Sequence, residues 1–238
     1  EATHGLFVFD PTMRVPFIVK PAKPLAEPVV VSDATVSIVD VAPTALSMLG
    51  QSVPEGLDGV DLSPMFSAAE NTRKGVYMEA LSPQQRFGYH PEIAVAEGPL
   101  KLMDTPSPRL FNVDEDPGEL TNLIGQHKEA EERMRQIAME TWAASTTADG
   151  SAPSPEVMEQ LAALGYVSTD FEHDEAASNI DAKDKVDVIS KIEDIRAQMQ
   201  ADRDFAKAEA DYRALIAAEP TLAEARMGLA RALGAQGK

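Results

Sequence analysis

The stretch 74–114, KGVYMEALSPQQRFGYHPEIAVAEGPLKLMDTPSPRLFNVD, decides the fold of this chain. It contains four short runs rich in apolar and β-branched residues: KGVYMEA, PEIAVAEG, PLKLMDT and PRLFNVD. Gly, Pro and Asp separate these runs, and such residues end strands and form turns. Short strands at this spacing predict an antiparallel meander.

A helix is predicted immediately after the meander, over about residues 118–145. Its apolar positions are Leu123, Ile124, Met134, Ile137 and Trp142. The preceding Asp114, Asp116 and Glu119 resemble a calcium loop only superficially. They lack the alternating ligand pattern that closes on a bidentate Glu, so they predict a turn and a helix N-cap.

Two elements are predicted upstream of the meander. Val15–Lys20 is a short apolar run closed by prolines, which predicts a buried strand. The run VSDATVSIVDVAPTALSMLG has apolar residues near helical spacing, and Pro43 suits the first turn. We therefore expect a helix from about Val41 to Leu49, with Asp40 before it and Gly50 as its C-cap.

The last part of the chain, about 186–238, is rich in alanine and predicted to be helical. Ala208, Tyr212 and Pro220 match the small residue, the aromatic and the terminal proline of a tetratricopeptide helix pair. A 34-residue register then predicts that the facing positions are Ile192, Ile195 and Met199 and, one period later, Arg226, Leu229 and Leu233. Any amphipathic helical hairpin is the alternative, because few consensus positions match.

Composition excludes several classes of partner and site. The formal net charge is −18, which disfavours nucleic acid and anionic lipid, and any sulfate site needs cations of its own. No apolar run approaches the roughly 18 residues that a membrane span needs. The chain has no cysteine, so disulfides and thiolate metal sites are excluded within it.

Several segments, taken in order, resemble the sulfatases of the alkaline phosphatase superfamily. They are THGLFVFDPTMRVPFIV, VDVAPTALSMLG, VPEGLDGVDLSPMF, VYMEA, AVAEGPLKLM and PRLFNVDEDPGELTNL. The later LAALGYV is similar to an element of sulfatase-like proteins that continue into tetratricopeptide repeats. The resemblance spans about residues 1–167 and implies a C-terminal fragment of such an enzyme.

The resemblance implies an α/β fold: the edge of a sulfatase-like parallel sheet, a small antiparallel α+β subdomain, and an all-α tetratricopeptide-like hairpin. The boundaries expected for these parts are 1–66 for the end of the main domain and 67–146 for the antiparallel subdomain with its packed helix. A linker with a short helix would occupy 147–185, and the repeat 186–238.

In this family a formylglycine attacks the sulfur of the ester while Ca²⁺ polarises the sulfuryl oxygens. The resemblance places the formylglycine and all calcium ligands upstream of this fragment, so we expect no metal ligand within it and no activity from the fragment alone. Related enzymes on this fold are phosphodiesterases, phosphonate hydrolases and phosphoglycerol transferases. A non-catalytic sulfatase remnant carrying a tetratricopeptide module for a protein partner is a third reading. The family also suggests a periplasmic or otherwise extracytoplasmic location.

Four residues are candidates for contact with a sulfate-ester substrate. His4 resembles the family's cationic position near the sulfate, where an imidazole could hydrogen-bond the ester or protonate the leaving group, although many relatives have Lys there. Lys101 matches a G-x-x-K strand pattern expected near the cleft rim. Arg86 and His90 belong to the loop QQRFGYHPE, which we expect to select the leaving group because loops carry specificity. Arg14, in contrast, is expected to form a structural ion pair with Asp10.

Overall fold

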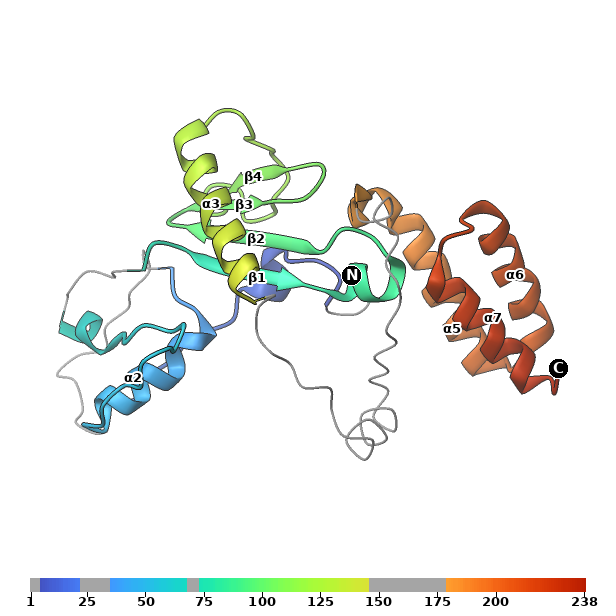
Figure 1. Ribbon diagram of the computed structural model, residues 1–238, viewed down its shortest axis with the longest axis horizontal. Coiled ribbons are helices and arrows are strands. Elements are labelled where there is room, and N and C mark those ends of the chain that lie inside the picture. Colours follow the sequence, from blue (N-terminus) through green and yellow to red (C-terminus); the bar gives the residue numbers. More distant parts are fainter. Residues whose placement is uncertain (1–4, 22–34, 68–72, 146–178) are drawn as a thin grey trace.

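The computed structural model describes residues 5–21, 35–67, 73–145 and 179–238. A four-stranded sheet with helix α3 lies at its centre, an arm containing α2 lies to one side, and three helices lie on the other (Figure 1). The linker predicted over 147–185, including LAALGYV, falls mostly outside the described residues.

The central sheet is an antiparallel meander in the order β1-β2-β3-β4, as the sequence predicts. Its strands are β1 (Val76–Ala80), β2 (Glu92–Glu97), β3 (Leu100–Met103) and β4 (Arg109–Asn112). Tight pairing brings Val95 opposite Leu102 across β2 and β3. Gly98 makes the β2–β3 turn with a φ of 57°, a conformation that favours glycine.

The two faces of the sheet are both apolar and are covered differently. Helix α3 (Lys128–Ser145) covers one face, where Met134 and Ala138 pack against Ile93, Val95 and Leu102. The alternate residues of the same strands point to the other face and pack with the N-terminal segment. That second cluster contains Val8, Ala80, Ala94, Met103 and Phe111. The other apolar residues predicted for this region, Leu123, Ile124, Ile137 and Trp142, are partly buried and pack against the same cluster.

Helix α3 begins at Lys128, so the prediction of a start near residue 118 was wrong. Side chains of Asp116 and Glu131 bind backbone N–H groups of the preceding loop that a helix would need. Asp116 Oδ2 accepts hydrogen bonds from the backbone of Leu120 and Thr121, at 2.8 and 2.7 Å. Glu131 Oε1 accepts from the backbone N–H of Gly125 at 2.6 Å. Such local bonds compete with helix formation, so the apolar periodicity continues into a loop.

The predicted strand Val15–Lys20 is also not formed. Residues 14–21 have no strand pairing, and the side chains of Val15 and Ile18 are exposed. A short helix, α1 (Asp10–Met13), precedes them instead. A strand needs a neighbour that takes up its backbone hydrogen bonds, and within the described residues the one sheet present is the antiparallel meander. The expected parallel-sheet edge is therefore absent from the described part.

The arm contains the short helices η1 (Ile38–Asp40), α2 (Val41–Met48) and η2 (Ser63–Ser67). The prediction of α2 is confirmed, and Gly50 ends it with a φ of 68°. Asp40 is fully buried and accepts from the backbone of Ser37 and Val60, each at 2.8 Å. The Thr44 hydroxyl accepts from the backbone of Leu62 at 2.9 Å. These two residues therefore fix the segment after α2 to the helix rather than only capping it.

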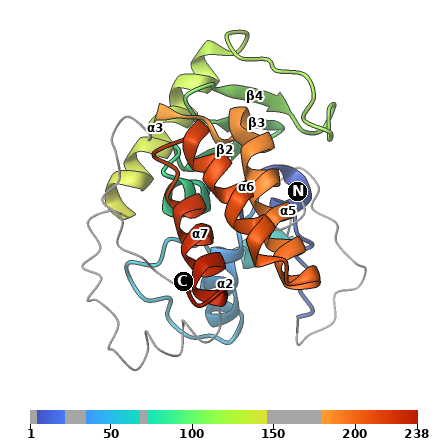
Figure 2. The ribbon, with the colours of Figure 1, turned by 90° about the vertical axis from the view of Figure 1, so that its right-hand side faces the viewer.

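The C-terminal part is a set of antiparallel helices that lie side by side in front of the sheet in Figure 2. After η5 (Ala182–Lys185) come α5 (Val186–Asp202), α6 (Phe205–Ala218) and α7 (Ala223–Ala235). Ile192 and Ile195 are buried and Met199 is partly buried, as predicted.

The prediction for the last helix was wrong at Arg226, which is exposed. Leu229 is partly buried and packs against the helical core, and Leu233 is half-buried. The buried face of α7 consists of Glu224, Ala225, Gly228 and Ala232. Small residues line it because the ring of Tyr212 from α6 packs directly against Gly228.

Candidate functional site

The segment that follows His4 is anchored in two hydrophobic clusters. His4 itself lies outside the described residues. Gly5 has a φ of 94°, which suits glycine, and directs the chain inward. Leu6 is 5% exposed and packs beside the helices, and Val8 is fully buried against the sheet. The residues that follow His4, the main catalytic candidate, are therefore held in position by hydrophobic packing.

A buried ion-pair triad continues this anchoring. Lys101 Nζ on β3 lies 2.8 Å from Asp10 Oδ1 and 2.8 Å from Glu119 Oε1. The backbone N–H of Asp10 also donates to Glu119 Oε2 at 2.7 Å. The Lys101 side chain is 1% exposed, and Glu119 reaches it from a left-handed backbone with a φ of 52°. The triad joins the N-terminal segment to the sheet and to the loop before α3.

Lys101 was a candidate for substrate contact, and that role stays a prediction. In the described residues its ammonium group faces two carboxylates and almost no solvent. Two anions held this close neutralise the cation, because ion pairs away from water are little screened. The geometry gives Lys101 a positioning function for the segment at Asp10. The expected ion pair between Arg14 and Asp10 is confirmed at 3.9 Å, although Arg14 is mostly exposed.

Arg86 and His90 lie at the contact between the sheet domain and the helices. Arg86 belongs to η3 (Pro83–Phe87), a single π-helical turn, and its guanidinium pairs with Glu193 of α5 at 2.5 Å. The backbone N–H of His90 donates to the carbonyl of Ile180 at 2.9 Å, and its Nδ1 lies 2.6 Å from the Pro91 carbonyl. The structure does not bring these two residues together with Lys101, and their proposed role in leaving-group selection is untested.

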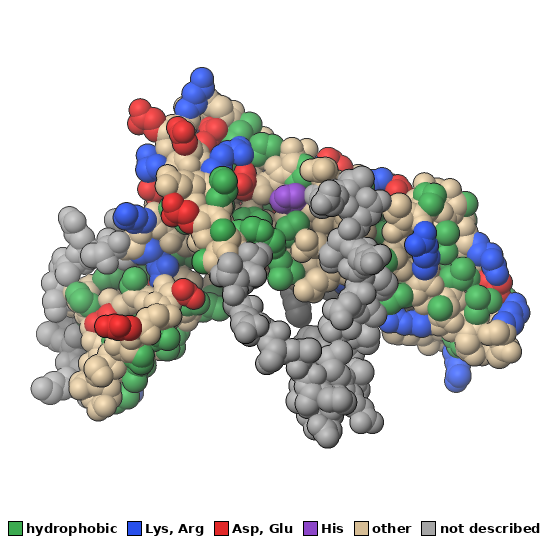
Figure 3. All heavy atoms as spheres, viewed as in Figure 1, with side chains coloured by type: hydrophobic (Ala, Val, Ile, Leu, Met, Phe, Trp, Pro, Cys, Tyr) green, Lys and Arg blue, Asp and Glu red, His purple; other side chains and the backbone are tan. Residues whose placement is uncertain are grey.

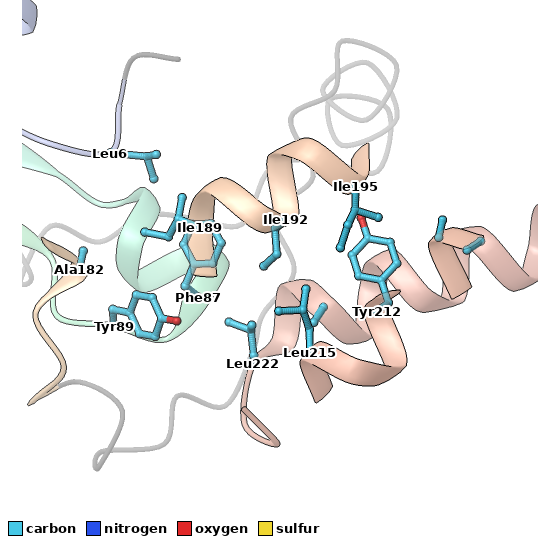
Figure 4. Packing of buried hydrophobic residues seen from close by; sticks show 13 residues of the cluster. Leu6, Phe87, Tyr89, Ala182, Ile189, Ile192, Ile195, Tyr212, Leu215 and Leu222 are labelled. Carbon is cyan, nitrogen blue, oxygen red and sulfur yellow. The ribbon is translucent and has the colours of Figure 1, made fainter. Parts of the chain in front are cut away.

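Two aromatic rings from the same loop form the core of this contact. Phe87 and Tyr89 stack with ring centroids 5.7 Å apart. Both rings are buried in one hydrophobic cluster with Leu6 and with Ile189 of α5 (Figure 4). The loop expected to select the leaving group therefore has two of its aromatic side chains inside the structure.

Burial of Tyr89 gives a testable pH dependence. Desolvation, reinforced by the carboxylates of Glu219 and Asp187, raises the pKa of the Tyr89 phenol to about 12. The phenol in an unfolded chain ionises near 10. The contribution to stability is therefore fully present below pH 10 and is lost as the pH rises from 10 to 12. We expect Tyr89→Phe to reduce the fall in melting temperature over this interval, measured by circular dichroism; an unchanged pH profile would contradict the assignment.

A second buried network attaches η5 to the sheet. Arg109 of β4 is 3.6 Å from Asp181 and 3.9 Å from Glu92 of β2. Asp181 also accepts a 2.7 Å hydrogen bond from the hydroxyl of Thr105. Its other carboxylate oxygen caps η5 through the backbone N–H of Lys183. The start of the helical part is thus bonded to the sheet as well as packed on it.

A pocket of about 520 Å³ lies between α3 and the β2–β3 turn. Arg73, Lys74 and Arg133 contribute cations to its lining. Arg73 pairs with Asp40, and Arg133 pairs with Glu97 at 3.1 Å. Figure 3 shows acidic and basic side chains interspersed over α3. Since two of the three cations already have carboxylate partners, we assign no anion site to this pocket.

Among the described residues, no three His, Asp or Glu side chains come close enough together to hold a metal ion. Within the same ranges, none of the helices has the length and apolarity required to span a bilayer.

Sequence reasoning missed both buried charge networks. Lys101 stands within the apolar run PLKLM, and a buried cation requires an anionic partner, so the sequence indicates that Lys101 has one. The sequence does not reveal which residue it is, because Asp10 lies 91 residues away in the chain. Asp181 and Arg109 gave no signal of pairing in the sequence at all.

Comparison with known proteins places this chain among sulfatases. A family model described as N-sulphoglucosamine sulphohydrolase, C-terminal, matches residues 4–144. Arylsulfatase K of Xenopus laevis is 27% identical over 147 residues, which are 55% of this chain and 26% of that protein. The chain therefore spans about a quarter of the length of this curated relative.

Similar solved structures also cover about half of this chain. Ps i-CgsB is 28% identical with a TM-score of 0.40, covering 50% of this chain and 26% of its own. BT4656, solved with D-glucosamine-2-N,6-O-disulfate, is 20% identical with a TM-score of 0.35, covering 46% and 24%. The family match extends from the segment at His4 through the meander to α3, which is more than half of the chain. This chain belongs to the N-sulphoglucosamine sulphohydrolase C-terminal family.

Proposed function

We propose that this chain is part of a sulfatase-like hydrolase that cleaves sulfate esters. The family match over residues 4–144 carries the proposal. The family takes its name from a sulphohydrolase and the curated relative is an arylsulfatase, so both names denote hydrolytic removal of a sulfo group. The buried triad around Lys101 supports it further, since it gives a fixed course to the segment next to His4.

The proposed role of His4 is to hydrogen-bond an ester oxygen of the substrate or to protonate the leaving group. Lys101 would position the segment through Asp10, and Arg86 and His90 would act from the η3 loop. The calcium and formylglycine of the proposed mechanism would be supplied by residues outside this sequence. When bound, the cation would polarise the sulfuryl oxygens. Secretion out of the cytoplasm is part of the same proposal.

The helices would form a tetratricopeptide-like unit with a protein partner. Burial of Ala208 and Tyr212 on α6 supports this reading, because these two residues match the small and the aromatic positions of the repeat pattern. The turn at Pro220 follows the end of α6 at Ala218, as the repeat pattern predicts.

Hydrolysis of an aryl sulfate and an aryl phosphate by the full-length protein, with and without calcium, tests the proposal. We expect calcium-dependent hydrolysis of the sulfate and a kcat at least about 100-fold lower in His4→Ala, as for loss of a general acid. His127→Ala is the matched control, because His127 is exposed in the loop before α3. Preference for the phosphate would favour phosphoryl chemistry on this fold, and no turnover of either would favour a binding module.

A further inference from the structure

We infer that helices α5 and α7 position the segment following His4, acting through Arg86 and the η3 loop. This inference rests on the proposed function only in giving His4 its role. The helical part would then help to hold the residues that follow His4 in position, and would not serve only to bind a protein partner.

The first step is the arrangement of the charged groups. The Arg86 guanidinium lies 2.5 Å from Glu193 of α5 and 3.6 Å from Glu224 of α7. Glu224 is 3% exposed and is also held by Arg196 of α5 at 2.8 Å. One arginine of the sheet domain thus bonds to two helices of the C-terminal part. Because Glu224 is buried, removing its cationic partners would leave a charge without compensation, unlike the loss of an ion pair on the surface.

The second step connects Arg86 to the N-terminal segment. Its guanidinium lies 4.9 Å from the centroid of the Phe87 ring, which stacks on Tyr89. Leu6 and Ile189 of α5 lie in the same hydrophobic cluster as these rings (Figure 4). The loop therefore packs in one core with both the helices and the residues that follow His4.

The start of the helical part is itself bonded to the sheet. The backbone bond from His90 to Ile180 and the pairing of Asp181 with Arg109 both join the start of the helical part to the sheet. A displacement of α5 would have to break these bonds and expose Leu6. Packed contacts of this kind transmit displacement because interiors are dense.

Hydrogen–deuterium exchange of the full-length protein tests the inference. Arg86→Ala should accelerate exchange about tenfold in peptides covering residues 5–9 and 82–90, as expected for a local opening. Exchange in β2 and β3 should stay unchanged, and Arg86→Lys should restore part of the protection. Arg213→Ala is the matched control: this exposed arginine pairs with Glu209 within α6 and should change neither peptide.

Faster exchange limited to α5–α7, with residues 5–9 unchanged, would show that the helices are an independent appendage. If Arg86→Ala also accelerates exchange in β2 and β3, the Glu224→Gln variant tests the inference instead. This variant changes the charged cluster only on α7. Acceleration at residues 5–9 in that variant supports the inference, and its absence refutes it. The exchange is measured without substrate, so a protein that hydrolyses no sulfate ester still gives a result.

Discussion

Replacing Lys101 with Met is expected to lower the free energy of unfolding by roughly 3–5 kcal/mol, the usual cost of removing one partner from a buried ion pair. The substitution keeps the length of the side chain but leaves Asp10 and Glu119 facing each other without a cation. The Glu119 side chain is 1% exposed, so water cannot replace the lost ammonium group. Urea denaturation followed by the fluorescence of Trp142, the one tryptophan of this chain, measures the effect close to the sheet.

Lys183→Met is the matched control for this experiment. Lys183 is 43% exposed and pairs with Asp184 at 3.5 Å, so its loss should cost less than about 1 kcal/mol. Adding Glu119→Gln to Lys101→Met should recover part of the stability, since it removes one of the two stranded charges. Equal stability of the two lysine variants would contradict the triad as a structural element.

Gly228→Ala is the second substitution for which we expect a large loss of stability. A Cβ at this position would overlap the ring of Tyr212, which is fully buried. We expect a loss of about 1–3 kcal/mol from overpacking, even though Ala is the better helix former. Native-state hydrogen exchange of α6 and α7 measures it.

The same helix offers a control of opposite sign. Gly234 in α7 has no atom within 4 Å of its would-be Cβ, so Gly234→Ala should stabilise the helices by up to about 1 kcal/mol. A destabilisation by both substitutions would indicate that glycine is needed for flexibility of α7 and not for the approach of Tyr212.

Local patterns were sufficient for most of the elements. The four apolar runs separated by Gly, Pro and Asp predicted the meander, because strand formation depends on short-range alternation and turn residues. Helix α2 and its Gly50 terminus followed from the same kind of signal. The order of the sulfatase-like motifs led to the family that the comparison gives for residues 4–144.

The errors occurred where the sequence signal was ambiguous. Val15–Lys20 has the composition of a strand, but a strand forms only against a neighbour, which composition does not reveal. The register of α7 differed from the repeat pattern because packing of Tyr212 on Gly228 decided which face turned inward.

The sequence by itself determined the meander, most of the helices and the family. Only the tertiary structure decided what the candidate residues contact. Lys101 meets Asp10 across 91 residues of chain, and Arg86 meets Glu193 across 107. Pairing over such separations depends on how whole elements pack, which no local periodicity or spacing encodes, and so the support of the site became visible only in three dimensions.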